Sequence, residues 1–337
     1  MKIVISSGGT LGHLMPIFPV VKKLKELDYE VILYTSRKLD FDKDVFDKIE
    51  DFEAYGLSKN IYNSIYKNLC CYRKIKKSIK KEKPDIVIGM GGYISGLTIL
   101  AASKLHIKTL IHEQNSVLGT ANKIVLNKVN YIIYSNESLK LNKDNSIFLP
   151  NPRSEVAAYY SKIYKKRKNQ ILIVSGSLGA KTLNEIGLNL SRNFKEYNFI
   201  LITGKRYFDG YKKYQKDNLK IFPKTKNLIK RICESSIVIT RAGATTISEI
   251  LGSSTVGIYI PSPNVTKNHQ EKNTMMIKEK TLGLVINEKE IKNYNIDIEF
   301  KKVLKDYDIY QKNLKRLDFN NVIKEYINII EGLISKN

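Results

Sequence analysis

Residues 241–249 join a glycine turn to a carboxylate near the start of a predicted helix. The β-branched run Ile237–Thr240 precedes the turn, and Ile247 and Ile250 recur on one face of the helix. Because such a turn leaves unpaired backbone N–H groups at the helix start, it suits a phosphate group. Glu249 lies about one and a half turns into the helix, where a carboxylate can accept hydrogen bonds from sugar hydroxyls. For this stretch alone, a packing turn with a solvated glutamate is an equal alternative.

Glycine turns also follow two other strand-like runs. Residues 7–13 come after Ile3–Ser6, and residues 176–180 come after Ile171–Ser175. These turns lie at the carboxyl ends of the strands, where open α/β sheets bind ligands. A dinucleotide oxidoreductase is the obvious alternative. However, residues 8–13 lack the G-x-G-x-x-G spacing, the second strand is followed by no ribose-binding acid, and no P-loop occurs.

The cysteine, histidine and aspartate patterns predict neither a disulfide framework nor a metal site. The three cysteines are Cys70, Cys71 and Cys233, an odd number that fits a reducing compartment. No histidine stands at a ligand spacing next to a cysteine or carboxylate cluster. Residues 40–42 and 306–308 hold aspartate pairs that could imitate a metal-binding pair, but both lie in charged segments typical of a solvated surface. We therefore expect no metal and no other cofactor.

The length of 337 residues suggests two domains, because a single core seldom grows beyond about 250–300 residues. The net charge of +24 reflects an excess of lysine, part of which fits a general bias towards Lys, Asn, Ile and Tyr. The remainder favours an anionic partner such as membrane lipid or a nucleotide. No RNA-reading signature is present, so we expect no nucleic acid partner. Without a signal peptide or a run of about 18 apolar residues, the chain is expected to be cytoplasmic.

The segment Tyr62–Lys83 is predicted to form a long basic helix. Its apolar face consists of Ile65, Leu69, Tyr72, Ile75 and Ile79. Its other positions carry Lys67, Arg73, Lys74, Lys76, Lys77, Lys80 and Lys81. One interpretation is a helix that packs on the core with a solvated basic side. The other is a helix that lies on anionic lipid, where each basic residue contributes about 1 kcal/mol.

Strand-like runs alternate with helical patterns along almost the whole chain, which predicts an α/β fold with parallel sheets. Further predicted strands are Val31–Tyr34, Asp85–Gly89, Thr109–His112, Tyr131–Tyr134, Phe199–Thr203 and Val256–Ile260. Residues 38–51 form an acidic segment without a clear pattern. Leu149–Pro152 and the basic, tyrosine-rich stretch up to Lys168 indicate a domain boundary. The second half repeats the plan of the first and ends with a helical stripe from Val322 to Leu333.

Several stretches together closely resemble the UDP-N-acetylglucosamine transferase family of peptidoglycan synthesis, within the two-domain GT-B glycosyltransferases. In chain order they are residues 8–13, 89–96, 112–116, 176–180, 241–249 and 269–273. The specific part is the sequence His-Glu-Gln-Asn at residues 112–115 with Gly-Met-Gly-Gly-Tyr upstream, whereas the glycine turns alone are common. Order and spacing fit over nearly the whole chain.

This resemblance implies a GT-B fold with two Rossmann-like domains whose parallel sheets face a central cleft. The acceptor and membrane-facing domain would cover residues 1–153, with the closing helix 318–337 packed back on it. The UDP-sugar donor domain would cover residues 154–317.

The resemblance also implies inverting transfer of N-acetylglucosamine from UDP-N-acetylglucosamine to the 4-hydroxyl of lipid-linked muramoyl-pentapeptide. This would be the last cytoplasmic step of peptidoglycan precursor synthesis, carried out at the cytoplasmic face of an anionic membrane. Inversion needs a base for the attacking hydroxyl and electrostatic support for the departing diphosphate. Without a metal, that support would come from N–H groups of the turns Gly9–Gly12 and Ser177–Ala180.

Matching positions assign the donor-binding residues. They are Thr10, Leu11, Gly12, Asn115, Arg153, Ser177, Thr225, Ala244, Thr245, Thr246, Ile247, Ser248, Glu249, Gln270 and Asn273. By the resemblance, Glu249 would bind the ribose hydroxyls and Ser177 the diphosphate. Gln270 and Asn273 would bind hydroxyls of the transferred sugar.

The catalytic candidates implied by the resemblance are His13 and Glu113, and Tyr93 is a candidate on the acceptor side. His13 would act as a base or contact a phosphate, since imidazole titrates in the right range. The alternative for His13 is a helix-start histidine that bonds locally. The alternative for Glu113 is a structural carboxylate that orients its loop.

Three positions depart from the family pattern. Leu11 stands where the family has glycine, Leu178 replaces a glutamine, and Arg153 lies one residue early in its Asn-Pro-x-Arg motif. Two alternatives stay open: a GT-B transferase with another lipid acceptor such as diacylglycerol, and a non-catalytic sugar-nucleotide-binding relative.

Overall fold

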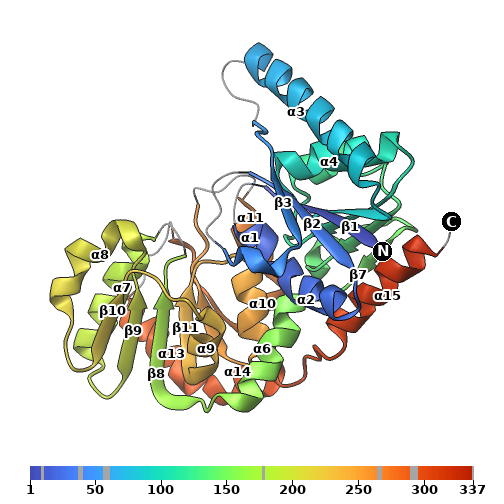
Figure 1. The fold of residues 1–337 in the computed structure, drawn as a ribbon. Coiled ribbons are helices and arrows are strands. Elements are labelled where there is room, and N and C mark those ends of the chain that lie inside the picture. Colours follow the sequence, from blue (N-terminus) through green and yellow to red (C-terminus); the bar gives the residue numbers. More distant parts are fainter. Residues whose placement is uncertain are drawn as a thin grey trace. The chain divides into compact units, whose positions relative to one another are not determined.

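The protein consists of two compact units, each built around one sheet (Figure 1). Unit 1 comprises Met1–Pro152 with Asn321–Asn337, and unit 2 comprises Arg153–Asn320. The computed structural model describes residues 1–8, 11–36, 41–55, 61–176, 179–263, 268–288 and 295–335.

Unit 1 contains a 7-stranded parallel sheet with the strand order β3-β2-β1-β4-β5-β6-β7. The strands are β1 (Lys2–Ser6), β2 (Glu30–Thr35), β3 (Lys48–Asp51), β4 (Ile86–Gly89), β5 (Lys108–Glu113), β6 (Tyr131–Tyr134) and β7 (Ser146–Phe148). Ser6 pairs in register with Gly89, so β1 and β4 end at the same edge of the sheet. That edge carries the turns that the sequence singled out.

Helices cover both faces of this sheet. They are α1 (Leu11–Leu14), α2 (Phe18–Glu26), α3 (Ile61–Glu82), α4 (Tyr93–Lys104), α5 (Thr120–Val125) and α15 (Val322–Ile334), with the 3-10 turns η1 (Met15–Ile17), η2 (Lys43–Val45) and η3 (Glu137–Leu139). Ile3 and Ile5 lie in one core cluster with α2 and α15, whereas Val4 lies in the other with α3 and α4. This alternation follows from the period of two along a strand.

Unit 2 contains a 6-stranded parallel sheet with the order β10-β9-β8-β11-β12-β13. Its strands are β8 (Arg167–Val174), β9 (Asn198–Ile202), β10 (Leu219–Phe222), β11 (Ser235–Thr240), β12 (Val256–Tyr259) and β13 (Gly283–Val285). Its helices are α6 (Pro152–Ile163), α7 (Lys181–Asn193), α8 (Lys205–Tyr211), α9 (Leu228–Glu234), α10 (Ala244–Gly252), α11 (His269–Asn273), α12 (Met275–Glu279), α13 (Ile296–Lys305) and α14 (Tyr307–Leu314), with the 3-10 turn η4 (Lys212–Tyr214).

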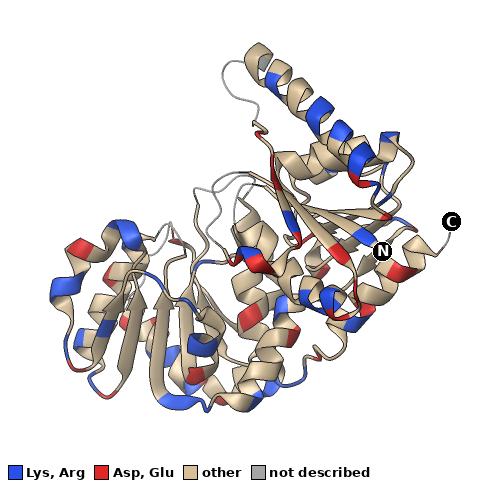
Figure 2. Cartoon of the chain, in the orientation of Figure 1, with Lys and Arg blue, Asp and Glu red and all other residues tan. Residues whose placement is uncertain are grey.

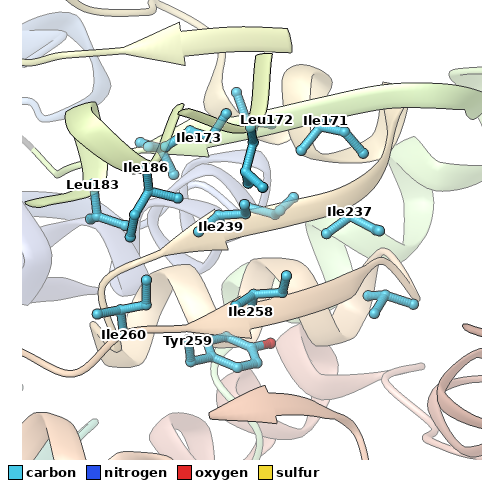
Figure 3. Close-up of a cluster of buried hydrophobic side chains, with 14 of the residues drawn as sticks. Ile171, Leu172, Ile173, Leu183, Ile186, Ile237, Ile239, Ile258, Tyr259 and Ile260 are labelled. Carbon is cyan, nitrogen blue, oxygen red and sulfur yellow. The ribbon is translucent and has the colours of Figure 1, made fainter. Parts of the chain in front are cut away.

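The core of unit 2 is filled by β-branched side chains from neighbouring strands (Figure 3). Ile171, Ile237 and Ile258 are each fully buried there. Tyr259 is the largest member shown, and its ring lies against Gly257, where an added Cβ would stand 2.5 Å from the tyrosine hydroxyl. Glycine at position 257 therefore makes the space for the Tyr259 ring.

The α/β fold with parallel sheets predicted from the sequence is confirmed. The strands that the sequence analysis did not predict are β3, β7, β10 and β13, and each lies at an edge of its sheet. Edge strands are covered on fewer sides, and these four are short and partly exposed. They therefore lack the continuous apolar run that marks a central strand of a parallel sheet.

The helix α3 differs from its prediction in which side chains reach the core. Ile75 and Ile79 are fully buried, but Ile65 and Leu69 are 53% and 44% exposed. Helical spacing identifies the residues on one face, but it does not tell how far along the helix the sheet continues. The apolar face of α3 is thus split into a buried half and an exposed half.

Candidate active site

The carboxyl edge of the unit 1 sheet has a topological switch point between β1 and β4. The chain leaves β1 towards β2 and leaves β4 towards β5, which lies on the other side, and ligands of open α/β sheets bind at such points. The two turns touch there: the N–H of Gly8 donates to the carbonyl of Gly91 over 3.1 Å. Gly92 has φ +85°, and an added Cβ would lie 2.4 Å from the Gly8 carbonyl oxygen. The turns can therefore approach this closely only with glycine at position 92.

His13 lies in α1, the first helix after β1, and is half-buried. Its Nδ1 atom is 3.0 Å from the side-chain nitrogen of Gln114, which follows β5. The same nitrogen of Gln114 donates to the carbonyl of Met90 over 3.1 Å. Three segments that are distant in sequence are thus joined around the His13 ring.

Glu113 ends β5 and is 3% exposed. Its Oε1 atom accepts hydrogen bonds from the backbone and side-chain nitrogens of Asn115, at 3.0 and 3.2 Å. Its Oε2 atom accepts from the Gly119 N–H at 2.8 Å and from the Asn122 amide at 3.0 Å. Because each oxygen already accepts two hydrogen bonds, the geometry favours the loop-orienting role over an acid–base role.

The other unit 1 candidates lie around the same edge. Leu11 and Gly12 form the start of α1, and Tyr93 opens α4 with 47% of its surface exposed. Asn115 is tied to Glu113 as described. Thr10 lies outside the described residues.

In unit 2 the switch point lies between β8 and β11, whose last residues Val174 and Thr240 pair in register. Gly243 follows β11 and precedes α10, and an added Cβ at this glycine would meet nothing within 4 Å. Gly243 has no side chain to cap the first N–H groups of α10. The start of this helix is therefore suited to a bound anion.

Glu249 and Arg153, both donor-site candidates, form a buried ion pair in unit 2. The Arg153 Nε and Nη2 atoms lie 2.8 and 2.6 Å from Oε1 of Glu249. Burial raises the pKa of Glu249, and the Arg153 guanidinium opposes that rise. Both of these contacts from Arg153 end on Oε1 of the carboxylate.

The residues expected to form the floor of the donor site, Ala244–Ser248, make up the first turns of α10. The Ser248 hydroxyl donates to the Ala244 carbonyl over 3.0 Å. Thr225 lies in the segment between β10 and α9 and is partly exposed. Ser177 lies outside the described residues.

Gln270 and Asn273, the candidates for contacts to the transferred sugar, belong to α11. The Gln270 side-chain oxygen accepts the Ser262 N–H at 2.9 Å. Asn273 is fully buried, and its amide donates to the carbonyl of Ala242 over 3.2 Å. For Asn273 this geometry favours a role in holding the Arg241–Gly243 turn.

Two further polar groups near these edges were not identified as site residues from the sequence. Arg241 donates to the Ile260 carbonyl over 3.1 Å and pairs with Glu288 at 2.6 Å, which braces the turn before α10. His112 is fully buried, with Nε2 2.8 Å from the Ser135 hydroxyl and Nδ1 3.5 Å from the Tyr326 hydroxyl of α15. Its position inside a buried strand run was the only sequence signal for this structural role.

Stability is expected to depend on pH through His112. Burial lowers the pKa of His112 to about 3, whereas an unfolded histidine titrates near 6.5. Below pH 6.5 the unfolded chain takes up a proton that the folded protein does not, so the stabilising effect of neutral His112 is lost as pH falls towards 3. The slope for one such group is about 1.4 kcal/mol per pH unit.

Urea unfolding between pH 7.5 and 5 measures this dependence. We expect the free energy of unfolding of His112→Gln to fall less steeply with decreasing pH than that of the wild type. Below pH 6 the difference between the two slopes should correspond to the uptake of one proton. His106 is exposed, so His106→Gln is the matched control and should keep the wild-type slope. Equal slopes for the wild type and His112→Gln would contradict the assignment to His112.

No group of three or more His, Cys, Asp or Glu side chains that could hold a metal ion occurs in the part of the chain that the structure describes. Among the helices in that part, none is long and apolar enough to cross a membrane.

Two parallel α/β units, each with glycine turns at a switch point, have the architecture of the GT-B fold. Family models match along most of the chain: the Glycosyltransferase family 28 N-terminal domain at residues 3–133 and the C-terminal domain at residues 170–326. The chain belongs to glycosyltransferase family 28.

Similar proteins include transferases from Lactobacillus helveticus and Listeria welshimeri. The first is 33% identical over 94% of both chains, and the second is 32% identical over 91% of both. Each carries the name UDP-N-acetylglucosamine–N-acetylmuramyl-(pentapeptide) pyrophosphoryl-undecaprenol N-acetylglucosamine transferase. Among solved structures, Acinetobacter baumannii MurG is similar in fold, with a TM-score of 0.79 and 22% identity over 98% of this chain and 100% of that one.

Proposed function

We propose that this protein transfers N-acetylglucosamine from UDP-N-acetylglucosamine to the 4-hydroxyl of lipid-linked muramoyl-pentapeptide. The observation that carries the proposal is the identity of 33% to a transferase with this activity in its name, over 94% of both chains. The buried carboxylate of Glu249 beside the open start of α10 supports it, because a nucleotide needs groups for both its ribose and its phosphates.

The proposed reaction is a single displacement with inversion at the anomeric carbon. The acceptor hydroxyl loses its proton to a base as the bond to UDP breaks, and the departing diphosphate gains negative charge. Backbone N–H groups at the start of α10 and in the glycine turns would stabilise that charge without a metal. Glu249 would hold the ribose and take no part in proton transfer.

A reconstituted assay tests the function. UDP release should require both UDP-N-acetylglucosamine and the lipid-linked muramoyl acceptor, and it should stop when either is left out. Diacylglycerol offered in place of the muramoyl lipid tests the nearest alternative acceptor. The proposal would be overturned if UDP were released with diacylglycerol as the acceptor but not with the muramoyl lipid. Tight UDP binding without turnover on any acceptor would also overturn it.

We further propose that α3 contacts an anionic membrane surface, from which the acceptor is taken. The first turns of α3 expose an apolar stripe of Tyr62 (88%), Ile65 (53%), Tyr66 (67%) and Leu69 (44%). Lysine and arginine residues follow along the same helix (Figure 2). Apolar side chains that enter the lipid interface, flanked by cations, are typical of helices that lie on anionic membranes.

Membrane binding is expected to weaken when the apolar stripe is made polar. The double variant Ile65→Ser/Leu69→Ser should lower partitioning into anionic vesicles by about tenfold or more, because each apolar side chain contributes about 1.5–3 kcal/mol when fully buried. Co-sedimentation with vesicles of phosphatidylglycerol and phosphatidylcholine measures the change. Ile163→Ser/Ile298→Ser removes two exposed isoleucines of unit 2 and is the matched control. Equal loss in both double variants would count against α3 as the contact.

A further inference from the structure

The contacts of Gln114 define which nitrogen of the His13 ring carries hydrogen. The side-chain nitrogen of Gln114 lies 3.1 Å from the Met90 carbonyl oxygen. A carbonyl oxygen only accepts hydrogen bonds, so the Gln114 atom facing it must be the amide NH₂ group. The same NH₂ group lies 3.0 Å from Nδ1 of His13 and uses its second hydrogen there. Nδ1 is therefore an acceptor, and the neutral ring carries its hydrogen on Nε2.

The surrounding backbone and side chains fix the positions of Gln114 and the His13 ring. Gln114 is 3% exposed, and Met90 is fully buried with its N–H donating to the Ser6 carbonyl over 2.8 Å. Gly91 lies directly against the ring, where an added Cβ would stand 3.0 Å from Nδ1. A hydrogen on Nδ1 would point at the Gln114 NH₂ group, and two donors facing each other in a buried site are unfavourable.

We propose that Gln114 is a positioning residue that holds His13 as a neutral Nε2–H donor. In this state His13 gives a hydrogen bond to a phosphate or sugar oxygen of the substrate and does not act as the general base, because Nε2 has no free lone pair to accept a proton. This inference rests on the proposed transferase function. Of the two roles expected for His13 from the sequence, it keeps the contact with the substrate and excludes the base.

The tautomer itself can be measured in the free protein by ¹⁵N NMR of the imidazole rings. There are only four histidines, and the spectrum of His13→Phe identifies the His13 signals. We expect a pyrrole-type Nε2 and a pyridine-type Nδ1 in the wild type. In Gln114→Glu the carboxylate can accept a hydrogen bond from Nδ1, so a hydrogen should appear there. Gln170→Glu changes another buried glutamine, bonded to Ser235 in unit 2, and should leave the His13 signals unchanged.

Two substitutions of His13 test the donor role during turnover. A glutamine side chain can present an N–H near the position of Nε2 but cannot serve as a base. His13→Gln should therefore keep kcat within about tenfold of the wild type, whereas His13→Phe should lose about a hundredfold or more, the range in which a catalytic contact acts. Equal losses in the two variants would overturn the donor role.

A pyrrole-type Nδ1 in the wild-type spectrum would overturn the proposed position of the hydrogen. These readouts separate the inference from the proposed function. If the wild type releases no UDP with the muramoyl acceptor, the function fails, while the NMR spectrum still decides the tautomer.

Discussion

Replacing Glu249 by glutamine is expected to raise the KM for UDP-N-acetylglucosamine by about a hundredfold, which corresponds to about 2.7 kcal/mol of lost binding. The carboxylate accepts the Arg153 guanidinium on Oε1, and Oε2 is proposed to accept ribose hydroxyls. A glutamine can keep its oxygen on Arg153, but it then turns an NH₂ group towards the ribose. The ribose hydroxyls can then only accept from this neutral NH₂ group. Hydrogen bonds to charged groups contribute about 1.5–3 kcal/mol each, so losing the bonds that the hydroxyls donate to the carboxylate produces an effect of this size.

Steady-state kinetics and calorimetric titration with UDP measure the effect, and Asp297→Asn is the matched control. Asp297 of α13 accepts hydrogen bonds from the amides of Asn189 and Asn193 in α7, at 2.9 and 2.6 Å, and has no proposed contact with the donor. The control should lose stability but keep the KM for the donor. An unchanged KM in Glu249→Gln would contradict the donor site as proposed.

Arg153→Met is expected to change the same site by removing the partner of Glu249. Burial already raises the pKa of Glu249, and removal of the guanidinium removes the effect that opposes the rise. The carboxylate of the variant should therefore become protonated at a higher pH than in the wild type. UDP affinity, measured by titration between pH 5 and 8, should fall with decreasing pH earlier in Arg153→Met.

Local sequence pattern was sufficient to predict the strand, turn and helix around Glu249, because each depends on residues only a few positions apart. The partner of Glu249 was not predictable in this way. Arg153 lies 96 positions earlier, and its assignment by motif was offset by one residue. Gln114 and His13 are separated by 101 positions. The hydrogen-bond partners of a site are set by which strands become neighbours in the sheet, and periodicity does not encode that order.

The role favoured for Glu113 could not be predicted from the sequence for the same reason, because it depends on hydrogen-bond partners. Its motif identified it as a polar residue after a strand, but a motif does not count the donors that surround a carboxylate. The donors come from Asn115, Gly119 and Asn122, which follow within one loop and the start of α5. Only the folded backbone shows that they converge on both oxygens.

Replacing Glu113 by glutamine is accordingly expected to lower the free energy of unfolding by about 3 kcal/mol. The amide has one oxygen, so its NH₂ group must face either the two Asn115 donors or the pair formed by Gly119 and Asn122. Two donors are then left unsatisfied in a buried site, and each costs about 1–3 kcal/mol. Urea unfolding measures the loss. Glu26→Gln, at a surface ion pair with Lys23, should change stability by less than about 0.5 kcal/mol.

The same variant separates the two roles considered for Glu113. A loop-orienting carboxylate predicts that activity falls together with stability, because the loop that carries Gln114 and Asn115 loses its anchor. An acid–base catalyst predicts the opposite pattern, in which Glu113→Gln folds with wild-type stability and loses turnover by about a hundredfold or more. Since the four donors are satisfied only by a charged carboxylate with two oxygens, we expect the first pattern.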